Sequence, residues 1–194
     1  MGLRIERKTD QRVVHACTHN LADIPNGVTV CAADLVAGGI LQEGTAIGKD
    51  EAGLYHVVKT AKIVEAATKT ATAYKVAKGH HFKVGDVVML KVGGAAYAIT
   101  AIDNTTDTTL DTITVGTTLG EDVAVGGALV QSTAAGATAG AFKYKPKAMT
   151  GDGYNVDALN NHLVVAVTIG QFKESVIPAT SDDIKDALPG IVLI

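Results

Sequence analysis

The sequence of 194 residues contains no tryptophan, and its aromatic residues are limited to five tyrosines and three phenylalanines. Glycan-binding proteins usually offer exposed aromatic rings to the sugar, because these side chains present large apolar faces. A carbohydrate site in this chain would therefore depend on its tyrosines, and the candidates are Tyr74, Tyr97, Tyr144 and Tyr154. The scarcity of aromatic residues disfavours sugar recognition as the main task and leaves it as an alternative.

Cysteine is also scarce, and no stretch is strongly basic or long and apolar. Cys17 and Cys31 lie in apolar stretches without the spacing of a metal or redox motif, so we expect free thiols, with a disulfide between them as the alternative. The formal net charge is −3 and no Lys/Arg cluster is present, so neither nucleic acid nor a membrane is an expected partner. No apolar run reaches the roughly 18 residues of a membrane span, and the N-terminus lacks the apolar core of a signal peptide.

The residues that are abundant are alanine, threonine, valine and glycine, the last at 21 positions. Small and β-branched residues with frequent glycine favour short strands and tight turns, so the sequence predicts a mainly β protein. A chain of this length forms one domain or two small ones and buries roughly 70% of its unfolded surface. The core should therefore need no covalent or metal support.

The last fifth of the chain has the clearest pattern. Residues 163–169 form a continuous apolar, β-branched run, which predicts a strand buried on both faces. Thr180 or Ser181 can cap a short helix that carries two carboxylates in its first turn and ends at residues 189–190, Pro-Gly. The apolar face of this helix comprises Ile184, Ala187 and Leu188. A closing strand is predicted at residues 191–194, and its apolar end implies a buried C-terminus.

Earlier elements are less distinct. Residues 12–18 predict the first strand, residues 25–27 a turn and residues 28–32 a second strand. Residues 34–63 are interrupted by several glycines, which predicts a β meander. Residues 149–154 are expected to form a surface loop.

Three motifs near the C-terminus resemble one protein family. V-x-V-x-I-G-x-F-x-E-S-x-I-P (165–178), I-K-D-A-L (184–188) and G-I-V-L-I (190–194) are similar to the C-terminal half of tailed-phage head decoration and head-fibre proteins. The meander adds to this resemblance, since I-L-x-x-G-T-x-I-G-K (40–49) is followed by G-L-Y (53–55), as in the hairpin of that family. The resemblance stops near Ile63 and resumes near Lys145.

The intervening segment has a different texture. About five short apolar runs follow one another at intervals of roughly eight to twelve residues, separated by turn residues, which predicts a small open barrel similar to SH3-like modules. Its private core is expected to contain Val84, Val87, Met89, Tyr97, Ile99 and Ile102. We therefore predict a decoration-like β domain (1–66 and 142–194), an inserted β-barrel (67–132) and a flexible, small-residue hinge (133–141).

The sequence offers little for metal binding. His80 and His81 are adjacent and would point to opposite sides of an extended chain, so only one of them could join His56. No Cys or acidic residue stands at a ligand spacing nearby, so we expect no metal and no cofactor. Residues 103–107 contain oxygen ligands but lack the glycine and distal glutamate of a calcium loop, which favours a hairpin turn.

Patterns for catalysis are missing too. Ser132, Ser175 and Ser181 fall in the predicted hinge, a turn and a helix cap, and none occupies a nucleophile elbow. Glu174, beside Ser175, is interpreted as a turn carboxylate. The paired glycines lack the Lys-Ser/Thr of a phosphate-binding loop. We therefore expect no enzymatic activity.

The N-terminal arm, residues 1–11, is polar, yet its first apolar residues alternate with charged ones. This alternation forms a strand when another chain supplies the sheet edge, and a frayed terminus is the alternative. Under the resemblance, the capsid-binding residues of this arm would be Leu3, Arg4, Ile5, Glu6 and Arg7.

The resemblance implies a structural virion protein, made in the bacterial cytoplasm and located on the capsid exterior. Its partner would be the major capsid protein, bound commonly by a trimer at three-fold positions after the shell expands. The inserted barrel departs from a simple cementing protein, so it favours a projecting head fibre or a module with a host-surface ligand. The alternative function is a tail or baseplate accessory module that binds host glycan through the barrel.

Overall fold

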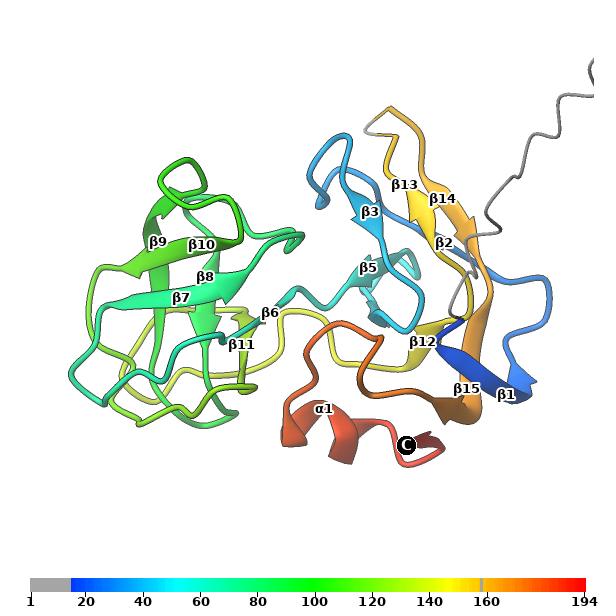
Figure 1. The fold of residues 1–194 in the computed structure, drawn as a ribbon. Coiled ribbons are helices and arrows are strands. Elements are labelled where there is room, and N and C mark those ends of the chain that lie inside the picture. Colours follow the sequence, from blue (N-terminus) through cyan, green and yellow to red (C-terminus); the bar gives the residue numbers. More distant parts are fainter. Residues whose placement is uncertain (1–14, 158) are drawn as a thin grey trace, which may run out of the picture.

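The computed structural model describes residues 15–157 and 159–194, where nearly every regular element is a β-strand (Figure 1). The strands form two main sheets that lie side by side, and α1 (Asp182–Ala187) lies close to the C-terminus. The predicted mainly β fold with one short C-terminal helix is confirmed. Within these residues, no helix has the length and apolar character needed to cross a membrane.

The first sheet has eight strands and unites segments from both ends of the chain. Its hydrogen-bonded order is β1-β15-β12-β4-β5-β2-β14, and β16 also pairs with β15. The bounds are β1 (Cys17–Asp23), β2 (Val28–Val30), β4 (Ala46–Lys49), β5 (Tyr55–Val57), β12 (Ala148–Thr150), β14 (His162–Val164), β15 (Ala166–Phe172) and β16 (Ile191–Leu193). A separate two-stranded sheet pairs β3 (Ile40–Leu41) with β13 (Tyr154–Asn155).

The second sheet has six strands, in the order β6-β11-β8-β9-β10-β7. It curves into a half-barrel, and its two end strands approach each other where Ile63 forms a bridge with Val76. The bounds are β6 (Thr60–Lys62), β7 (Ala73–Ala77), β8 (Val87–Met89), β9 (Ala96–Asp103), β10 (Leu110–Val115) and β11 (Ala128–Ser132). This sheet begins at β6, a few residues before the predicted start of the insert.

Three core clusters hold the sheets together. One lies within the half-barrel around Tyr74, Ile99 and Ile113, and another lies within the first sheet around Leu41 and Ile47. The third is shared between the sheets: Met89 and Val130 of the half-barrel pack in the same cluster as apolar residues of the first sheet and α1. The shared cluster means that the half-barrel is not packed as an independent body.

The private core predicted for the half-barrel is partly wrong. Ile99 is buried there, and Tyr97 and Ile102 pack against it. Met89 and Val87, by contrast, belong to the shared cluster, because alternate residues of β8 face opposite sides of the sheet and only Val88 points into the half-barrel. Val84 is exposed in the turn before β8.

The run at residues 163–169 is not one strand buried on both faces. It divides between β14, which pairs with β2, and β15, which pairs with β1, β12 and β16. Leu163 is 62% exposed and Ile169 is 47% exposed, because each lies on a strand face that no other layer covers within the described residues.

Residues 149–154 were expected on the surface, yet they begin in the middle of the first sheet. β12 is buried throughout and pairs with β4 on one side and β15 on the other. A strand of three residues is too short to show the alternation by which strands are recognised. β12 connects the strands of the meander with those of the C-terminal segment.

The C-terminal helix agrees with its prediction. The Ser181 hydroxyl accepts a hydrogen bond from the Ile184 N–H at 3.3 Å, and Ile184 and Leu188 are buried. β16 then runs parallel to β15. The prediction of a buried C-terminus is wrong, since Val192 and Ile194 are exposed.

At the N-terminal end, the first described strand is β1, which lies later in the chain than the strand predicted at residues 12–18. The predicted arm, residues 1–11, lies outside the described residues. β2 confirms the second predicted strand in shorter form.

The segment at residues 133–141 is not an extended hinge. It folds back in a turn in which Gly136 exchanges two backbone hydrogen bonds with Ala96, at 2.8 and 2.9 Å. Gly140 adds a backbone bond to Gly94, and Thr133 bonds to Ala141. Small residues permit this close approach of two backbone segments. The composition alone had indicated a flexible segment instead.

Candidate functional site

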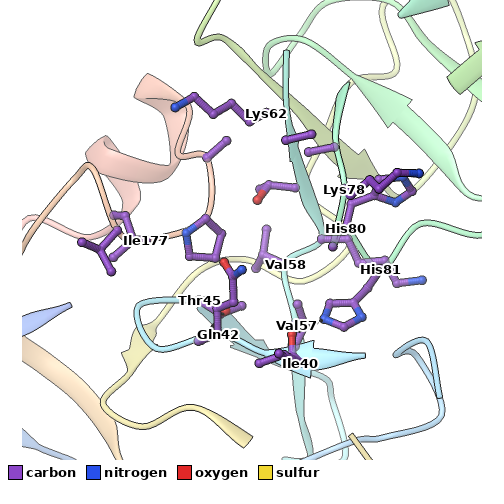
Figure 2. A pocket seen from close by; sticks show the side chains of 18 of the residues that line it. Ile40, Gln42, Thr45, Val57, Val58, Lys62, Lys78, His80, His81 and Ile177 are labelled. Atoms are coloured by element: carbon purple, nitrogen blue, oxygen red, sulfur yellow. Dashed lines mark hydrogen bonds between the residues drawn. The ribbon is translucent and has the colours of Figure 1, made fainter. Parts of the chain in front are cut away.

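A cleft that could receive a ligand lies at the junction of the two sheets, with a volume of about 230 Å³ (Figure 2). One wall comes from β3 and the residues around β5 and β6, including Gln42, Thr45 and Lys59. The opposite walls come from the turn after β7, with His80 and His81, and from the segment around Ile177. Both polar and apolar side chains therefore line the cleft.

His81 links the half-barrel to the loop after β2 and to β3. The Val36 N–H donates to its Nδ1 at 3.3 Å, so the ring carries its proton on Nε2, which donates to the Ile40 carbonyl at 3.1 Å. Burial lowers the pKa of His81, which favours this neutral form. The ring is therefore a structural link, because both of its nitrogens are engaged by backbone groups.

His80 faces a different partner, as expected for adjacent residues. Its Nδ1 accepts from the Phe82 N–H at 3.2 Å, and its Nε2 lies 3.3 Å from an Asp111 carboxylate oxygen without the alignment of a hydrogen bond. Asp111 also receives a 2.6 Å bond from Lys78. Burial lowers the pKa of His80 more than the Asp111 charge raises it.

A buried ion pair lies at the base of the junction. Lys59, between β5 and β6, donates to Asp86 at 2.8 Å, and Asp86 also accepts from the side-chain amide of Gln131 at 3.1 Å. Burial lowers the pKa of Lys59, and the Asp86 carboxylate opposes this shift. The charge of Lys59 is therefore paired within the protein.

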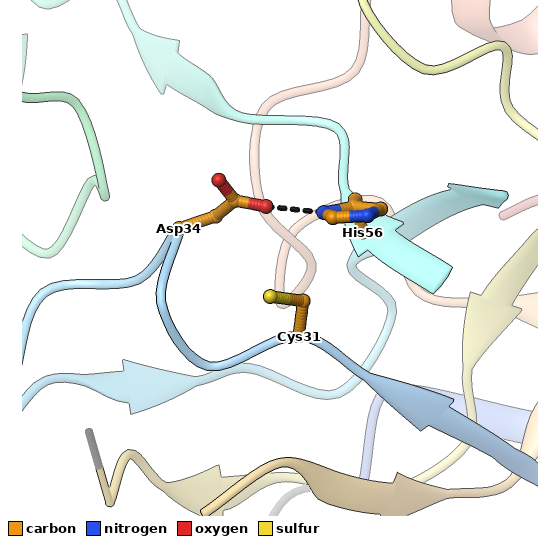
Figure 3. A group of neighbouring side chains, drawn as sticks. All are labelled: Cys31, Asp34 and His56. Atoms are coloured by element: carbon orange, nitrogen blue, oxygen red, sulfur yellow. Dashed lines mark hydrogen bonds and ion pairs between the residues drawn. The ribbon is translucent and has the colours of Figure 1, made fainter. Parts of the chain in front are cut away.

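A second group of polar residues surrounds His56 on β5 (Figure 3). Its Nδ1 contacts the Asp34 carboxylate, its Nε2 lies 3.2 Å from Asp50, and the Sγ of Cys31 completes the set. One ligand atom each from Cys31, Asp34 and His56 lies within 4.8 Å of the others. The hydrogen bond from His56 is the main cause that lowers the pKa of Asp50. Such a donor set suits a transition-metal ion.

Ligand spacing in the sequence does not reveal this group. Asp34 precedes His56 by 22 positions, and neither His80 nor His81 joins it. Only Asp50 could have been inferred from sequence, because it occupies the tight turn between β4 and β5, where antiparallel pairing sets Gly48 opposite His56. Cys17 and Cys31 are both free thiols, as expected, and both are partly buried.

The residues considered for catalysis occupy structural positions. Ser181 caps α1, and buried Ser132 accepts from the Ala141 N–H at 3.2 Å. Ser175 lies exposed in the turn after β15, where the neighbouring Glu174 forms a 2.8 Å ion pair with Lys185. Asp103 accepts from the amides of the two threonines at 105 and 106, which makes the expected hairpin turn. These contacts cap turns and helices without assembling a nucleophile and a base.

All eight aromatic residues lie in the described part of the chain, and none is exposed. Tyr74 is fully buried, Tyr97 packs against the half-barrel core, and Tyr144 stacks on His56 with ring centres 4.0 Å apart. Tyr154 is half-buried beside His162. The tyrosines considered for sugar binding therefore form no exposed platform.

The residues proposed for capsid binding, Leu3, Arg4, Ile5, Glu6 and Arg7, lie outside the described residues.

Comparisons with known proteins add no relative: no protein-family model, no curated protein and no solved structure matches the chain.

Proposed function

We propose that this protein is an auxiliary head protein of a tailed phage, which binds the outer surface of the capsid shell and stabilises it or projects from it as a head fibre. The observation that carries the proposal is the way the resembling motifs assemble. Motifs from residues 40–55 and 165–194 are far apart in the sequence, yet their strands β4, β5, β15 and β16 belong to one sheet, joined through β12. The segment without the resemblance supplies five of the six strands of the other sheet, and β6 supplies the sixth.

The surface of the first sheet is compatible with binding a large partner. Apolar side chains are exposed on β1, β15 and β16, namely Leu21, Ile169 and Val192. β1 is also an edge strand, so part of its backbone is free of sheet pairing within the described residues. Protein surfaces that combine exposed apolar side chains with a sheet edge can support association with another chain.

Stabilisation of the capsid by binding would require no catalysed reaction. A protein that binds only the expanded shell stabilises it by RT ln(1 + [L]/Kd) at each site, which is about 2.7 kcal/mol at a hundredfold excess over Kd. Repetition over the lattice would resist the pressure of packaged DNA. The partner in this proposal is the major capsid protein, and the assembly that binds it is a homotrimer.

Co-sedimentation with expanded and unexpanded heads of the cognate phage, followed by electron microscopy, tests the proposal. Saturable binding to expanded heads alone is expected. Deletion of residues 1–8 should abolish this binding and leave circular dichroism unchanged, because the arm is proposed to add a strand to the capsid or to a neighbouring subunit. Unchanged binding would reject the arm, and binding to neither form of the head would reject the function.

A matched pair of variants separates strand addition from simple charge attraction. Leu3→Ser with Ile5→Ser removes the apolar face of an added strand, whereas Arg4→Ser with Glu6→Ser removes the charged face and leaves the net charge the same. The first pair should weaken binding more than the second. The reverse order would contradict strand addition.

A further inference from the structure

The contacts of His56 raise a question of charge. If Nε2 carries the ring proton and donates to Asp50 at 3.2 Å, then Nδ1 presents a lone pair to the carboxylate of Asp34. Two lone pairs repel each other at contact distance unless a cation lies between them. That cation is either a shared proton or a metal ion.

The position of Cys31 distinguishes these two cations. A proton joins two atoms, whereas the Sγ of Cys31, the carboxylate of Asp34 and a ring nitrogen of His56 converge as three donors within 4.8 Å (Figure 3). Zinc binds sulfur, nitrogen and oxygen at about 2.0–2.3 Å in tetrahedral sites, which sets the ligand atoms roughly 3–4 Å apart. The three ligand atoms lie within 4.8 Å of one another, so side-chain adjustments would bring them into this range.

We propose that Cys31, Asp34 and His56 form a binding site for a transition-metal ion of the zinc class, with Asp50 as the residue that orients His56. A thiolate and a carboxylate balance the charge of a divalent ion, and the neutral imidazole binds through Nδ1. The mixture of sulfur, nitrogen and oxygen favours zinc or cobalt over calcium and magnesium, which prefer oxygen alone. Three protein ligands leave a fourth position for water or for a group from a partner.

The surroundings of His56 have the features that support metal ligands. A carboxylate on the second ring nitrogen fixes the tautomer and the orientation of a metal-bound histidine, and Asp50 occupies this position. The ring of Tyr144 stacks on His56 with an angle of 8° between the planes. Gly48 lets the backbone next to Tyr144 approach β4 closely, because a Cβ at that position would lie 2.3 Å from the Lys145 carbonyl oxygen.

The backbone brings the ligands together through a parallel strand pair. β2 and β5 are parallel neighbours, and the Cys31 N–H donates to the Tyr55 carbonyl at 2.8 Å, so Cys31 lies at the end of β2 beside His56. Asp34 then returns from the loop that follows β2. The same loop touches the half-barrel through the contact of Val36 with His81 and through a 2.9 Å bond from Lys83 to the Ala33 carbonyl. A bound ion would thus fix the loop after β2, which contacts the half-barrel.

Cobalt titration of the full-length protein tests the site. The chain is reduced with a non-chelating phosphine, stripped with a chelator and titrated with Co²⁺, followed by Zn²⁺. We expect one cobalt per chain, a thiolate-to-cobalt charge-transfer band in the near ultraviolet, intense visible bands of a four-coordinate ion, and displacement by zinc. A protein that binds only a proton at His56 would give none of these bands and would overturn the proposal.

Three variants test the roles assigned to Cys31 and Asp50. Cys31→Ser should abolish the charge-transfer band, whereas Cys17→Ser, the control at the other partly buried thiol, should retain it. Asp50→Asn should keep the band and weaken affinity about 10- to 100-fold, as for other groups that orient a ligand. A band that survives in Cys31→Ser, or that disappears in Cys17→Ser, would reject the assigned ligands. Circular dichroism of each variant establishes that the fold is retained.

Discussion

The buried ion pair between Lys59 and Asp86 gives the sharpest stability prediction. Asp86→Ala leaves the Lys59 ammonium without its 2.8 Å partner in a position where its side chain is only 3% exposed. Removal of one partner from a buried pair costs about 3–5 kcal/mol. Asp86 is itself 16% exposed, so water reaches the site in part, and we expect a loss near the lower end, about 3 kcal/mol in the free energy of unfolding.

Urea unfolding followed by circular dichroism measures this loss, since the chain has no tryptophan to report by fluorescence. The matched control is Glu65→Ala, which breaks an ion pair with Lys75 of the same 2.8 Å length whose side chains are 46% and 56% exposed. An exposed pair contributes less than about 1 kcal/mol. Equal losses in Asp86→Ala and Glu65→Ala would refute the argument that burial decides the effect.

A double variant and a pH series examine the same reasoning. Lys59→Met with Asp86→Leu removes both charges and should recover most or all of the stability lost in Asp86→Ala. Burial holds the pKa of Lys59 below 10.5 in the folded state, so the unfolded chain binds more protons between the two pKa values and stability rises with pH there. The free energy of unfolding that Asp86→Ala loses relative to the unaltered protein should therefore become smaller as the pH approaches 10.5.

Three further predictions concern the cap, a close contact and the junction. Ser181→Ala should lower the free energy of unfolding by about 1 kcal/mol in urea titration, whereas Ser181→Asp should retain it, because either oxygen caps α1. Gly48→Ala should destabilise the fold and disturb the stack of Tyr144 on His56, because its Cβ would meet a backbone oxygen at 2.3 Å; unchanged stability and aromatic circular dichroism would contradict this. Burial lowers the pKa of His81 from 6.5, so the unfolded state binds more protons below that pH, and stability should fall on acidification by up to about 1.4 kcal/mol per pH unit for this residue. Urea midpoints between pH 7.5 and 5.5 measure the slope, which His81→Leu should reduce.

Local chemistry made the C-terminal helix predictable. A hydroxyl N-cap, two carboxylates in the first turn and Pro-Gly after the last turn act within a few residues, and the helix has the expected bounds. The turns of the half-barrel were predictable for the same reason, as the Asx-type turn at Asp103 illustrates. These signals need no knowledge of distant partners.

Burial and pairing were harder to predict, because they depend on long-range contacts. The apolar run at residues 163–169 contains no residue that marks its division, which follows from β14 and β15 pairing with different strands. Val88 and Met89 face opposite sides of β8 by simple alternation, but the sequence does not tell that each side is covered by a different core. The group around His56 depends in the same way on the parallel pairing of β2 with β5.

The shared core changes how the function of the half-barrel can be tested. Deletion of the segment between β5 and β12 would remove Met89 and Val130 from the cluster that also contains Met149, Val167 and Phe172. Apolar residues that are buried at the junction would then meet water, at a cost of roughly 25 cal/mol for each Å² exposed. Such a truncated chain should aggregate or unfold, so its loss of capsid binding would report on folding rather than on recognition. Substitutions on the exposed surface of the half-barrel, at residues such as Val125 or Lys69, leave the junction intact and can separate a role in binding from a role in stability.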